Sequence, residues 1–279
     1  MTSARPSVLY VSDLAYPATG RRYCDEDIFL TSRLREEFDL AVCHPLDAAA
    51  LMNAFDAVVV RNSGPVLNYQ AQYDAFRARA VADGVRVYNP LSGKGDMAGK
   101  GYLLELTAAG FPVIPTIDRA EDLDRLPDVG TYVVKPKLGA DSIGLQFVPR
   151  DRLTDPAAYG DVLVQPRVDF DYEVSFYFVD HTLQYALYAP RPEERWALQP
   201  YEPTERDREF AQRFVDWNDI AYGIQRVDAC RAPGGELLLV ELEDLNPYLS
   251  LDVLSATARD AFVTRVKTSL HGLIGEKTP

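Results

Sequence analysis

Apolar and polar positions follow two different periods along the first ninety residues. Short apolar runs rich in β-branched residues predict strands, because such side chains suit a pleated sheet. Longer stretches between them repeat their apolar positions at helical spacing and predict helices. The predicted strands are SVLYVS (7–12), LAV (40–42), DAVVVR (56–61) and VRVYN (85–89), and the predicted helices cover 27–38 and 70–84. This alternation indicates a parallel sheet with helices on its faces, so we expect an N-terminal α/β domain over residues 1–95.

The pattern changes after the Asn89-Pro90 pair and the linker LSGKGD. Residues 97–109 predict a short amphipathic helix that Gly110 ends. Short strands then follow closely, at FPVIPTI (111–117), TYVVKP (131–136), LQFVP (145–149) and DVLVQP (161–166). A helix beside several short strands predicts a small antiparallel α+β unit, for which we expect the bounds 96–165.

Residues 166–279 predict a third unit. The predicted elements are strands at 172–180 and 182–189, a helix over 205–217, a hairpin at 225–247 and a last helix from about Asp252 to His271. The segment PRPEERWALQPYEPTE, rich in Pro and Glu, predicts a surface loop. In the hairpin, Gly234-Gly235 predicts a two-residue turn, since glycine readily adopts the positive φ that such turns need.

Acidic residues occur on both strands of this hairpin. In a register without a bulge, Asp228 lies opposite Glu241 and Arg226 lies opposite Glu243, all on one face. Opposed carboxylates destabilise a sheet unless a cation neutralises them. Two interpretations remain open from this stretch alone. The acids either move apart on a water-exposed face, or they form an oxygen-ligand site for Mg²⁺ that also uses substrate phosphates.

Composition narrows the class of protein. The 279 residues suffice for two or three cores, and a formal charge of -13 with a pI near 4.7 argues against nucleic acid or an anionic membrane as partner. No apolar run reaches the length of a membrane span. Neither the three cysteines nor the three histidines show metal-ligand spacing, and the first residues lack a charged segment followed by an apolar run. We therefore expect a reduced, cytoplasmic protein.

Two lysines could hold phosphate. Lys100 lies on the predicted helix at 97–109, and Lys135 ends an apolar strand where the loop KLGADSIG begins. A lysine there can place its charge on a phosphate while loop amides donate to the phosphate oxygens. The loop matches neither G-x-x-x-x-G-K-[ST] nor G-x-G-x-x-G, and a solvated surface lysine is the common alternative. The order along the chain favours the phosphate role: two lysines, a Gly/Ser loop, the strand VLVQP, an acid eight positions later, and the acidic hairpin.

In this order the elements resemble the ATP-grasp superfamily of carboxylate-amine ligases, which includes D-alanine:D-alanine ligase, glutathione synthetase and the RimK-type ligases. The similarity covers roughly residues 96–252, and the segment before it looks like the N-terminal domain that these enzymes share. In the D-alanine ligase pattern, RVDF is followed by Glu-x-Asn thirteen residues after its Asp. Here RVDA is followed by Glu241-Leu242-Glu243, and Asp228 and Glu241 are thirteen apart. The stretch VELEDLNPYLSLD also resembles the subgroup that contains the cycloserine-forming O-ureidoserine cyclo-ligase.

The resemblance implies an α/β ATP-grasp fold, in which two α+β subdomains hold ATP between them, preceded by the parallel-sheet domain. It implies nucleotide-binding roles for Lys100, Lys135, Lys137 and Ser142 at the phosphates, Gln165, Pro166 and Val168 at adenine, and Glu173 at the ribose. It implies Mg²⁺ on Asp228, Glu241 and Glu243, with Arg226 close to the transferred phosphoryl group. Glu243 stands where many members have Asn, which adds negative charge at the metals.

Four further residues are candidates. Arg61 and Asn62 follow a predicted strand at its carboxyl end, where open α/β sheets bind ligands, and Asp13 leaves the first strand in the same way. In the superfamily the N-terminal domain helps to hold the acceptor, so Arg61 would pair with a substrate carboxylate, with a turn or capping role as the equal alternative. Arg191, in the Pro/Glu-rich loop, would cap the phosphate, with a bare surface arginine as the alternative.

The implied activity is ATP-dependent formation of an amide bond, between two molecules or within one, through an acyl phosphate. Small-molecule acids and amines would be the partners, with ATP and Mg²⁺, and a homodimer is expected by analogy only. Two alternatives stay open: a small-molecule kinase on the same fold, and a nucleotide-binding module without turnover. An arginine beside the metal acids argues against the module, which would not need it.

Overall fold

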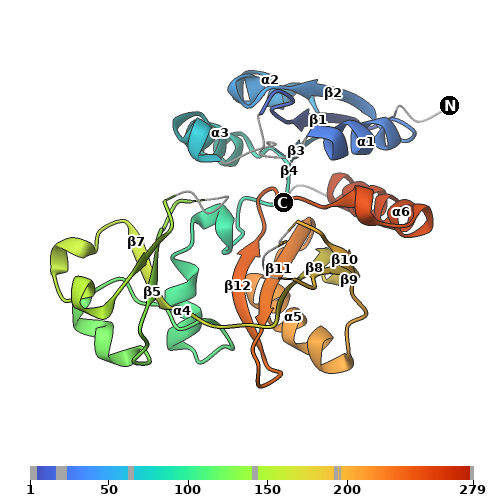
Figure 1. Cartoon of the computed structure of the whole chain (residues 1–279). Helices are drawn as coiled ribbons and strands as arrows, with labels where there is room; N and C mark the ends of the chain where they lie inside the picture. Colours follow the sequence, from blue (N-terminus) through green and yellow to red (C-terminus); the bar gives the residue numbers. More distant parts are fainter. Residues whose placement is uncertain are drawn as a thin grey trace.

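Three units make up the molecule (Figure 1). The computed structural model describes residues 5–16, 24–61, 66–139, 144–191, 194 and 196–276. The N-terminal domain holds a four-stranded sheet in the order β2-β1-β3-β4, with every neighbouring pair parallel. Its strands are β1 (Ser7–Val11), β2 (Asp39–Cys43), β3 (Ala57–Val60) and β4 (Val87–Tyr88), and its helices are α1 (Cys24–Leu34), α2 (Ala48–Leu51) and α3 (Gln70–Asp83). The parallel α/β domain predicted from the alternation is confirmed.

A small unit with a three-stranded antiparallel sheet follows. Its order is β6-β5-β7, with β5 (Tyr132–Pro136), β6 (Gln146–Val148) and β7 (Val162–Pro166). The helix predicted over 97–109 is shorter: α4 covers Tyr102–Ala108, and a 3-10 turn at Asp96–Ala98 precedes it. Gly99 separates the two with a φ of +85°, which breaks the helix. Lys100 therefore lies in a turn before α4 and not on the predicted helix.

The strand predicted at FPVIPTI does not form. Two isolated bridges remain, from Val113 to Leu239 and from Ile117 to Val164. Pro112 and Pro115 lack the N–H groups that a sheet ladder needs, so the segment cannot be a continuous inner strand. It runs instead from α4 to the small sheet, and its two bridges join the small unit to the strand that holds Leu239.

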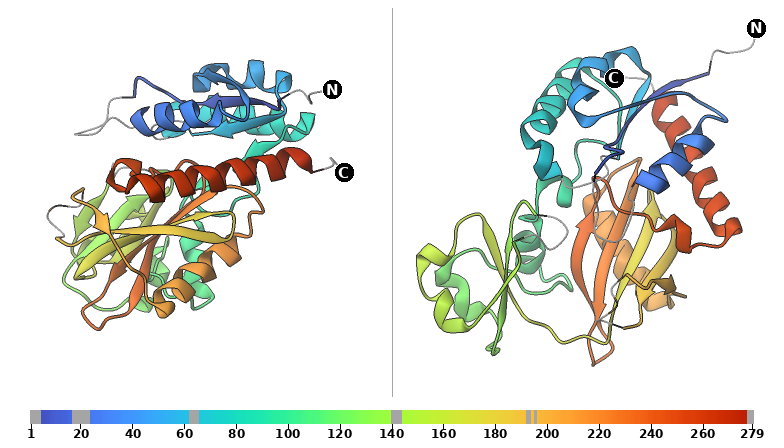
Figure 2. Two further views of the ribbon diagram at one scale, coloured as in Figure 1. Left: turned by 90° about the vertical axis from the view of Figure 1, so that its right-hand side faces the viewer. Right: turned by 45° about the horizontal axis from the view of Figure 1, so that its top comes forward.

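The third unit is a five-stranded antiparallel sheet in the order β10-β9-β8-β11-β12. Its elements are β8 (Tyr172–Val179), β9 (Thr182–Ala189), β10 (Gln199–Pro200), β11 (Ile224–Arg231), β12 (Leu237–Glu243), α5 (Glu205–Asn218) and α6 (Ala256–Gly275). Phe210 and Phe214 of α5 pack on one face of the sheet. On the other side, α6 lies between the sheet and the N-terminal domain (Figure 2), and Phe262 shares a core there with Tyr10 and Tyr177.

The acidic hairpin has the predicted pairing for a reason that the sequence did not show. Asp228 pairs with Glu241 and Arg226 with Glu243, as expected. The turn, however, is one residue longer than predicted: Ala232 N donates to Glu236 O, and Gly235 takes a φ of +87°. A bulge between positions 228 and 229 compensates for the longer turn and restores the register.

The linker before the small unit is clasped to the end of β12. Asp244 is fully buried and accepts hydrogen bonds from Gly95 N at 2.9 Å and Met97 N at 2.8 Å. In return, Asp96 Oδ1 accepts from Asp244 N at 2.7 Å and Leu245 N at 3.1 Å. This reciprocal contact, which we call the Asp96–Asp244 clasp, fixes the chain next to both Lys100 and Glu243.

The clasp leaves no room for a side chain at position 95. A Cβ on Gly95 would lie 2.7 Å from Leu242 O and 3.0 Å from Asp244 Cγ. We expect Gly95→Ala to lower the free energy of unfolding by about 1–3 kcal/mol, the usual cost of overpacking. Gly101→Ala is the matched control, since nothing lies within 4 Å of its added Cβ. Urea unfolding of both variants measures the difference, and equal stabilities would contradict the described clasp.

Candidate functional site

Arg226 holds two carboxylates of the hairpin together. Its guanidinium donates to both oxygens of Asp228, with Nη2 2.7 Å from Oδ2 and Nε 2.9 Å from Oδ1, and it also donates to Glu243. Its Nη1 donates to Tyr248 O at 2.8 Å, and Ser175 Oγ donates to Asp228 Oδ1 at 2.6 Å. The arginine therefore neutralises Asp228, one of the two facing acids, together with its own cross-strand partner Glu243.

Lys100 neutralises the third carboxylate. Its Nζ lies 2.5 Å from Glu241 Oε1, and the residue is 8% exposed. Lys100 N also donates to Lys137 O at 2.8 Å, which ties the turn before α4 to the end of β5. The first contact places Lys100 beside a hairpin acid, and the second places the backbone of Lys137 next to Lys100.

Burial and charge perturb this cluster strongly. Burial raises the pKa of Glu243 to about 8, against the attraction of Arg226 and with help from the charges of Asp228 and Glu241. Burial alone would also raise the pKa of Glu241, but the cations Lys100 and Lys135 hold that pKa below its usual value. Burial lowers the pKa of the Lys135 ammonium to about 8. A set of perturbed groups at one place is typical of functional sites.

The donor chemistry of the cluster fits a hard divalent cation. Asp228, Glu241 and Glu243 offer only carboxylate oxygens on neighbouring positions, and each is already in contact with a protein cation. In the part of the chain that the structure describes, no group of three or more His, Cys, Asp or Glu side chains is arranged to hold a metal ion. Binding of Mg²⁺ would thus require Lys100 and Arg226 to turn from the acids, and the metal ligands stay a prediction.

The remaining nucleotide candidates lie on and near the small sheet. Gln165, 4% exposed, donates from Nε2 to Thr116 Oγ1 at 2.8 Å, so its amide supports the sheet. Lys137 Nζ lies 2.9 Å from Asp118 Oδ2. Pro166 is buried, and Val168 and Glu173 are half-buried. Ser142 lies outside the described residues.

Arg191 pairs with Glu194 on the surface, and its side chain is 59% exposed. This exposed position agrees with the alternative interpretation of Arg191 as an ordinary surface arginine. Its role as a phosphate cap stays a prediction that no contact supports.

The N-terminal candidates are engaged by other residues. Arg61 is 5% exposed and donates to Glu26 at 2.8 Å and to Asp27 at 3.3 Å. Asp13 is also buried and accepts from Tyr69 Oη. Asn62 lies outside the described residues. A role for Arg61 in binding a substrate carboxylate would have to use its Nη1, which has no hydrogen-bond partner among the residues described.

Several supporting residues escaped the sequence analysis. Glu26 accepts from the amides of Leu249 and Ser250, at 3.0 and 3.1 Å, and so joins α1 to the segment after β12. Tyr102 Oη accepts from Leu242 N at 2.6 Å, between the two hairpin glutamates. The Asp96–Asp244 clasp also escaped the sequence analysis. Each aspartate ends a short polar stretch, GKGD or ELED, but nothing in the sequence indicated that these two stretches lie in contact.

The lowered pKa of Lys135 predicts a pH dependence of nucleotide binding. An ammonium is charged below its pKa, so the charge that holds a phosphate is lost as pH rises through about 8. We expect the affinity for Mg-ADP to be constant from pH 6.5 to 7.5 and to fall above pH 8. Lys135→Arg should show a smaller fall, because arginine stays charged, while Glu243, whose pKa is also about 8, ionises over the same range in both proteins. Calorimetric titrations at each pH test it, and identical profiles for both proteins would contradict the assignment.

Comparison with known proteins adds sequence and structural likenesses. No protein-family model matches the chain. It is 28% identical over 252 residues to the cycloserine biosynthesis protein DcsG of Streptomyces lavendulae, covering 75% of this chain and 82% of that protein. Among the described residues, no helix has the length and apolar character needed to cross a membrane.

Solved structures resemble the whole chain. D-cycloserine synthetase DcsG superposes with a TM-score of 0.73 at 24% identity, covering 96% of this chain and 100% of that one. The ATP-grasp ligase PsnB, in complex with a phosphomimetic variant of its minimal precursor, Mg and ADP, has a TM-score of 0.62 at 18% identity. This likeness covers 95% of this chain and 99% of that one. D-alanine–D-alanine ligase from Bacillus anthracis, complexed with ATP, has a TM-score of 0.64 at 13% identity, covering 97% of this chain and 96% of that one.

Proposed function

We propose, from the premise that this chain has the ATP-grasp fold, that it is an ATP-dependent carboxylate-amine ligase. The fold and the resemblance to ATP-grasp ligases predicted from the sequence are confirmed by the likenesses to DcsG, PsnB and D-alanine–D-alanine ligase. One observation carries the proposal for the reaction: two neighbouring sets of ion pairs, Lys100 with Glu241 and Arg226 with Asp228 and Glu243, form one partly buried charge cluster.

The cluster suits phosphoryl transfer better than nucleophilic catalysis. Lys100 and Lys135 would hold phosphate oxygens as point charges, and Arg226 would neutralise the charge that develops on the transferred group. The transfer needs positioning and charge neutralisation, so no protein nucleophile is required. Cys230, the one cysteine on the hairpin, is 1% exposed, and burial raises the pKa of its thiol to about 11. It stays protonated near neutral pH and is a poor nucleophile.

Asp228, Glu241 and Glu243 would hold Mg²⁺, and the ion would neutralise the negative charge of the phosphates. When the lysine and arginine turn from these acids toward the phosphates, each cation keeps a negative partner. The substrate carboxylate would then attack the γ-phosphate of ATP, which gives an acyl phosphate and ADP. An amine would displace the phosphate and form the amide. Because acyl phosphates hydrolyse, the units must exclude water from the cluster.

The substrates we propose are a small acid and a small amine, or one molecule that carries both groups. DcsG is described as a cycloserine biosynthesis protein, and its 28% identity to this chain favours an amino-acid-derived metabolite over a protein substrate. The acidic net charge of the chain means that an anionic acid must be held by local cations.

The experiment is ADP release with Mg-ATP across a matrix of amino acids and small amines, with product masses recorded. Release that needs one acid and one amine supports intermolecular ligation. Release with one compound alone, with loss of the mass of water, supports cyclisation, while gain of a phosphoryl group would show a kinase. If no compound causes release although Mg-ATP raises the melting temperature, the ligase proposal fails for the acids and amines tested, which leaves an untested substrate or a binding module as the alternatives.

A further inference from the structure

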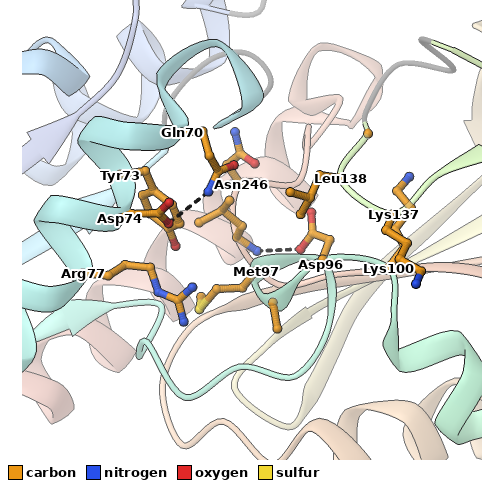
Figure 3. A pocket seen from close by; sticks show the side chains of 14 residues that line it. Gln70, Tyr73, Asp74, Arg77, Asp96, Met97, Lys100, Lys137, Leu138 and Asn246 are labelled. Atoms are coloured by element: carbon orange, nitrogen blue, oxygen red, sulfur yellow. Dashed lines mark hydrogen bonds between the residues drawn. The ribbon is translucent and has the colours of Figure 1, made fainter. Parts of the chain in front are cut away.

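A cavity of about 280 Å³ lies beside the charge cluster, between α3 of the N-terminal domain and the turn at Asp96–Ala98 (Figure 3). Lys100 of the cluster also lines it, together with Leu138 and Asn246. The cavity is of a size for one small molecule, and it opens beside the lysine that we place at the phosphates. A substrate held there would lie next to the transferred phosphoryl group.

Among the described residues that line the cavity, Arg77 is a cation without an acid partner, while the carboxylate of Asp96 accepts from the backbone amides of Asp244 and Leu245. Lys100 pairs with Glu241 and Lys137 with Asp118. Asp74 accepts from Gln70 Nε2 at 2.9 Å. Arg77, in contrast, has no carboxylate within ion-pair distance in the part of the chain described: its Nη2 donates weakly to Leu91 O at 3.5 Å, and its guanidinium lies 5.7 Å from the Tyr73 ring centre.

A second side chain at the cavity lacks a partner. Tyr73 is 8% exposed, and its hydroxyl is buried with no hydrogen-bond partner among the described residues. Burial of a hydroxyl without a partner is unfavourable, so buried hydroxyls normally have a hydrogen-bond partner. Figure 3 shows Tyr73 and Arg77 extending from the same side of α3 toward the segment that carries Met97. A guanidinium and a phenol side by side, both donors, suit a planar anion.

We propose that this cavity binds a non-reacting carboxylate of the small-molecule substrate, with Arg77 as the ion-pair partner and Tyr73 as a hydrogen-bond donor. The inference rests on the proposed ligase function. It assigns α3 a part in substrate selection, because a molecule without this carboxylate would leave Arg77 and Tyr73 unpaired in the complex. In a dicarboxylate such as succinate the second, reacting carboxylate would face Lys100 and the γ-phosphate, and in an amino acid that acts as the acceptor the reacting group would be its amine.

The test compares three variants with the wild type, each saturated with the non-hydrolysable nucleotide Mg-AMPPNP. Arg77→Gln and Tyr73→Phe each remove one donor while keeping most of the side chain. Arg79→Gln is the matched control on the same helix, because Arg79 is half-exposed and pairs with Asp83 away from the cavity. The probes are glycine, D-alanine, L-alanine and succinate, the amides glycinamide and alaninamide, and inorganic phosphate. Melting temperatures at rising probe concentration give each dissociation constant.

We expect at least one carboxylate probe to stabilise the wild type and Arg79→Gln, while its amide does not. Arg77→Gln should weaken that probe about tenfold or more, and Tyr73→Phe about two- to tenfold, as expected for a charged and a neutral hydrogen bond. Equal binding by Arg77→Gln and Arg79→Gln, a response to phosphate alone, or no response to any carboxylate would each overturn the proposal. The stabilisation by Mg-AMPPNP itself reports on the proposed function and should be the same in all four proteins, so failure of the nucleotide site is seen separately.

Discussion

Glu241→Gln is expected to abolish ATP turnover while leaving the fold intact. Glu241 is the carboxylate that Lys100 contacts at 2.5 Å, and it is also the predicted Mg²⁺ ligand that Lys100 would release. The substitution removes the charge and keeps the shape. Neutralisation of phosphate charge is worth several kcal/mol, and every ~1.4 kcal/mol is a factor of ten in rate, so we expect a loss of at least about a thousandfold in ADP release.

Glu236→Gln is the matched control for this change. Glu236 lies exposed in the turn of the same hairpin, and the same substitution there should leave ADP release within about twofold of the wild type, because an exposed charge is screened by water. Melting temperatures of both variants check the fold. Turnover by Glu241→Gln at more than a tenth of the wild-type rate would remove Glu241 from the proposed metal site.

Asp244→Ala is expected to cause the largest loss of stability. Asp244 is fully buried and accepts from Gly95 N, Met97 N and Asn218 Nδ2, the last at 3.0 Å. Alanine leaves these buried donors without an acceptor, and each such group costs about 1–3 kcal/mol. Since the loss of the Asp244 charge also relieves the half-buried Asp96, we expect a net fall of about 3 kcal/mol in the free energy of unfolding, measured by urea denaturation.

The comparison variant is Asp252→Ala, at an exposed aspartate in the segment that follows. A surface substitution of this kind usually changes stability by no more than about 0.5 kcal/mol. The clasp also carries the turn that holds Lys100, so Asp244→Ala should raise the Kd for Mg-ADP even in the fraction that stays folded. A stability loss below 1 kcal/mol together with unchanged nucleotide affinity would contradict a positioning role for Asp244.

The sequence predicted the hairpin register correctly from two wrong premises whose errors cancel. Pairing of Asp228 with Glu241 followed from a two-residue turn without a bulge, whereas the chain uses a longer turn and a bulge at 228/229 that cancel. Strand period and glycine content constrain the turn only to within one residue. The burial of one hairpin face selects the final register, and that is a tertiary effect.

Lys100 shows another limit of local patterns. Its apolar neighbours read as one helix over 97–109, but Gly99 adopts a positive φ because the chain must turn there to meet the end of β5. Arg61 shows a third limit. Its place at a strand end was visible, but its partners Glu26 and Asp27 come from α1, and the sequence gives no spacing from which that contact follows.

Neither the clasp nor the α3 cavity could be predicted from the sequence, because each depends on contacts between segments that lie far apart along the chain. Asp96 and Asp244 lie 148 residues apart, and α3 reaches the cavity only because the N-terminal domain packs over the other units. The order of charged residues along the chain predicted a phosphate and Mg²⁺ site from these residues, and that chemistry stays a prediction. The packing of three units decides which groups surround it.

Transfer of ¹⁸O from the substrate carboxylate to phosphate tests the central claim most directly. An acid that supports ADP release is labelled with ¹⁸O in its carboxylate and converted with Mg-ATP and the amine, and the released phosphate is analysed by mass spectrometry. The account predicts one ¹⁸O atom in each phosphate, because the carboxylate oxygen that attacks the γ-phosphate leaves with it when the amide forms. Unlabelled phosphate would show that water or another group attacks ATP, and it would contradict activation of a carboxylate at this site.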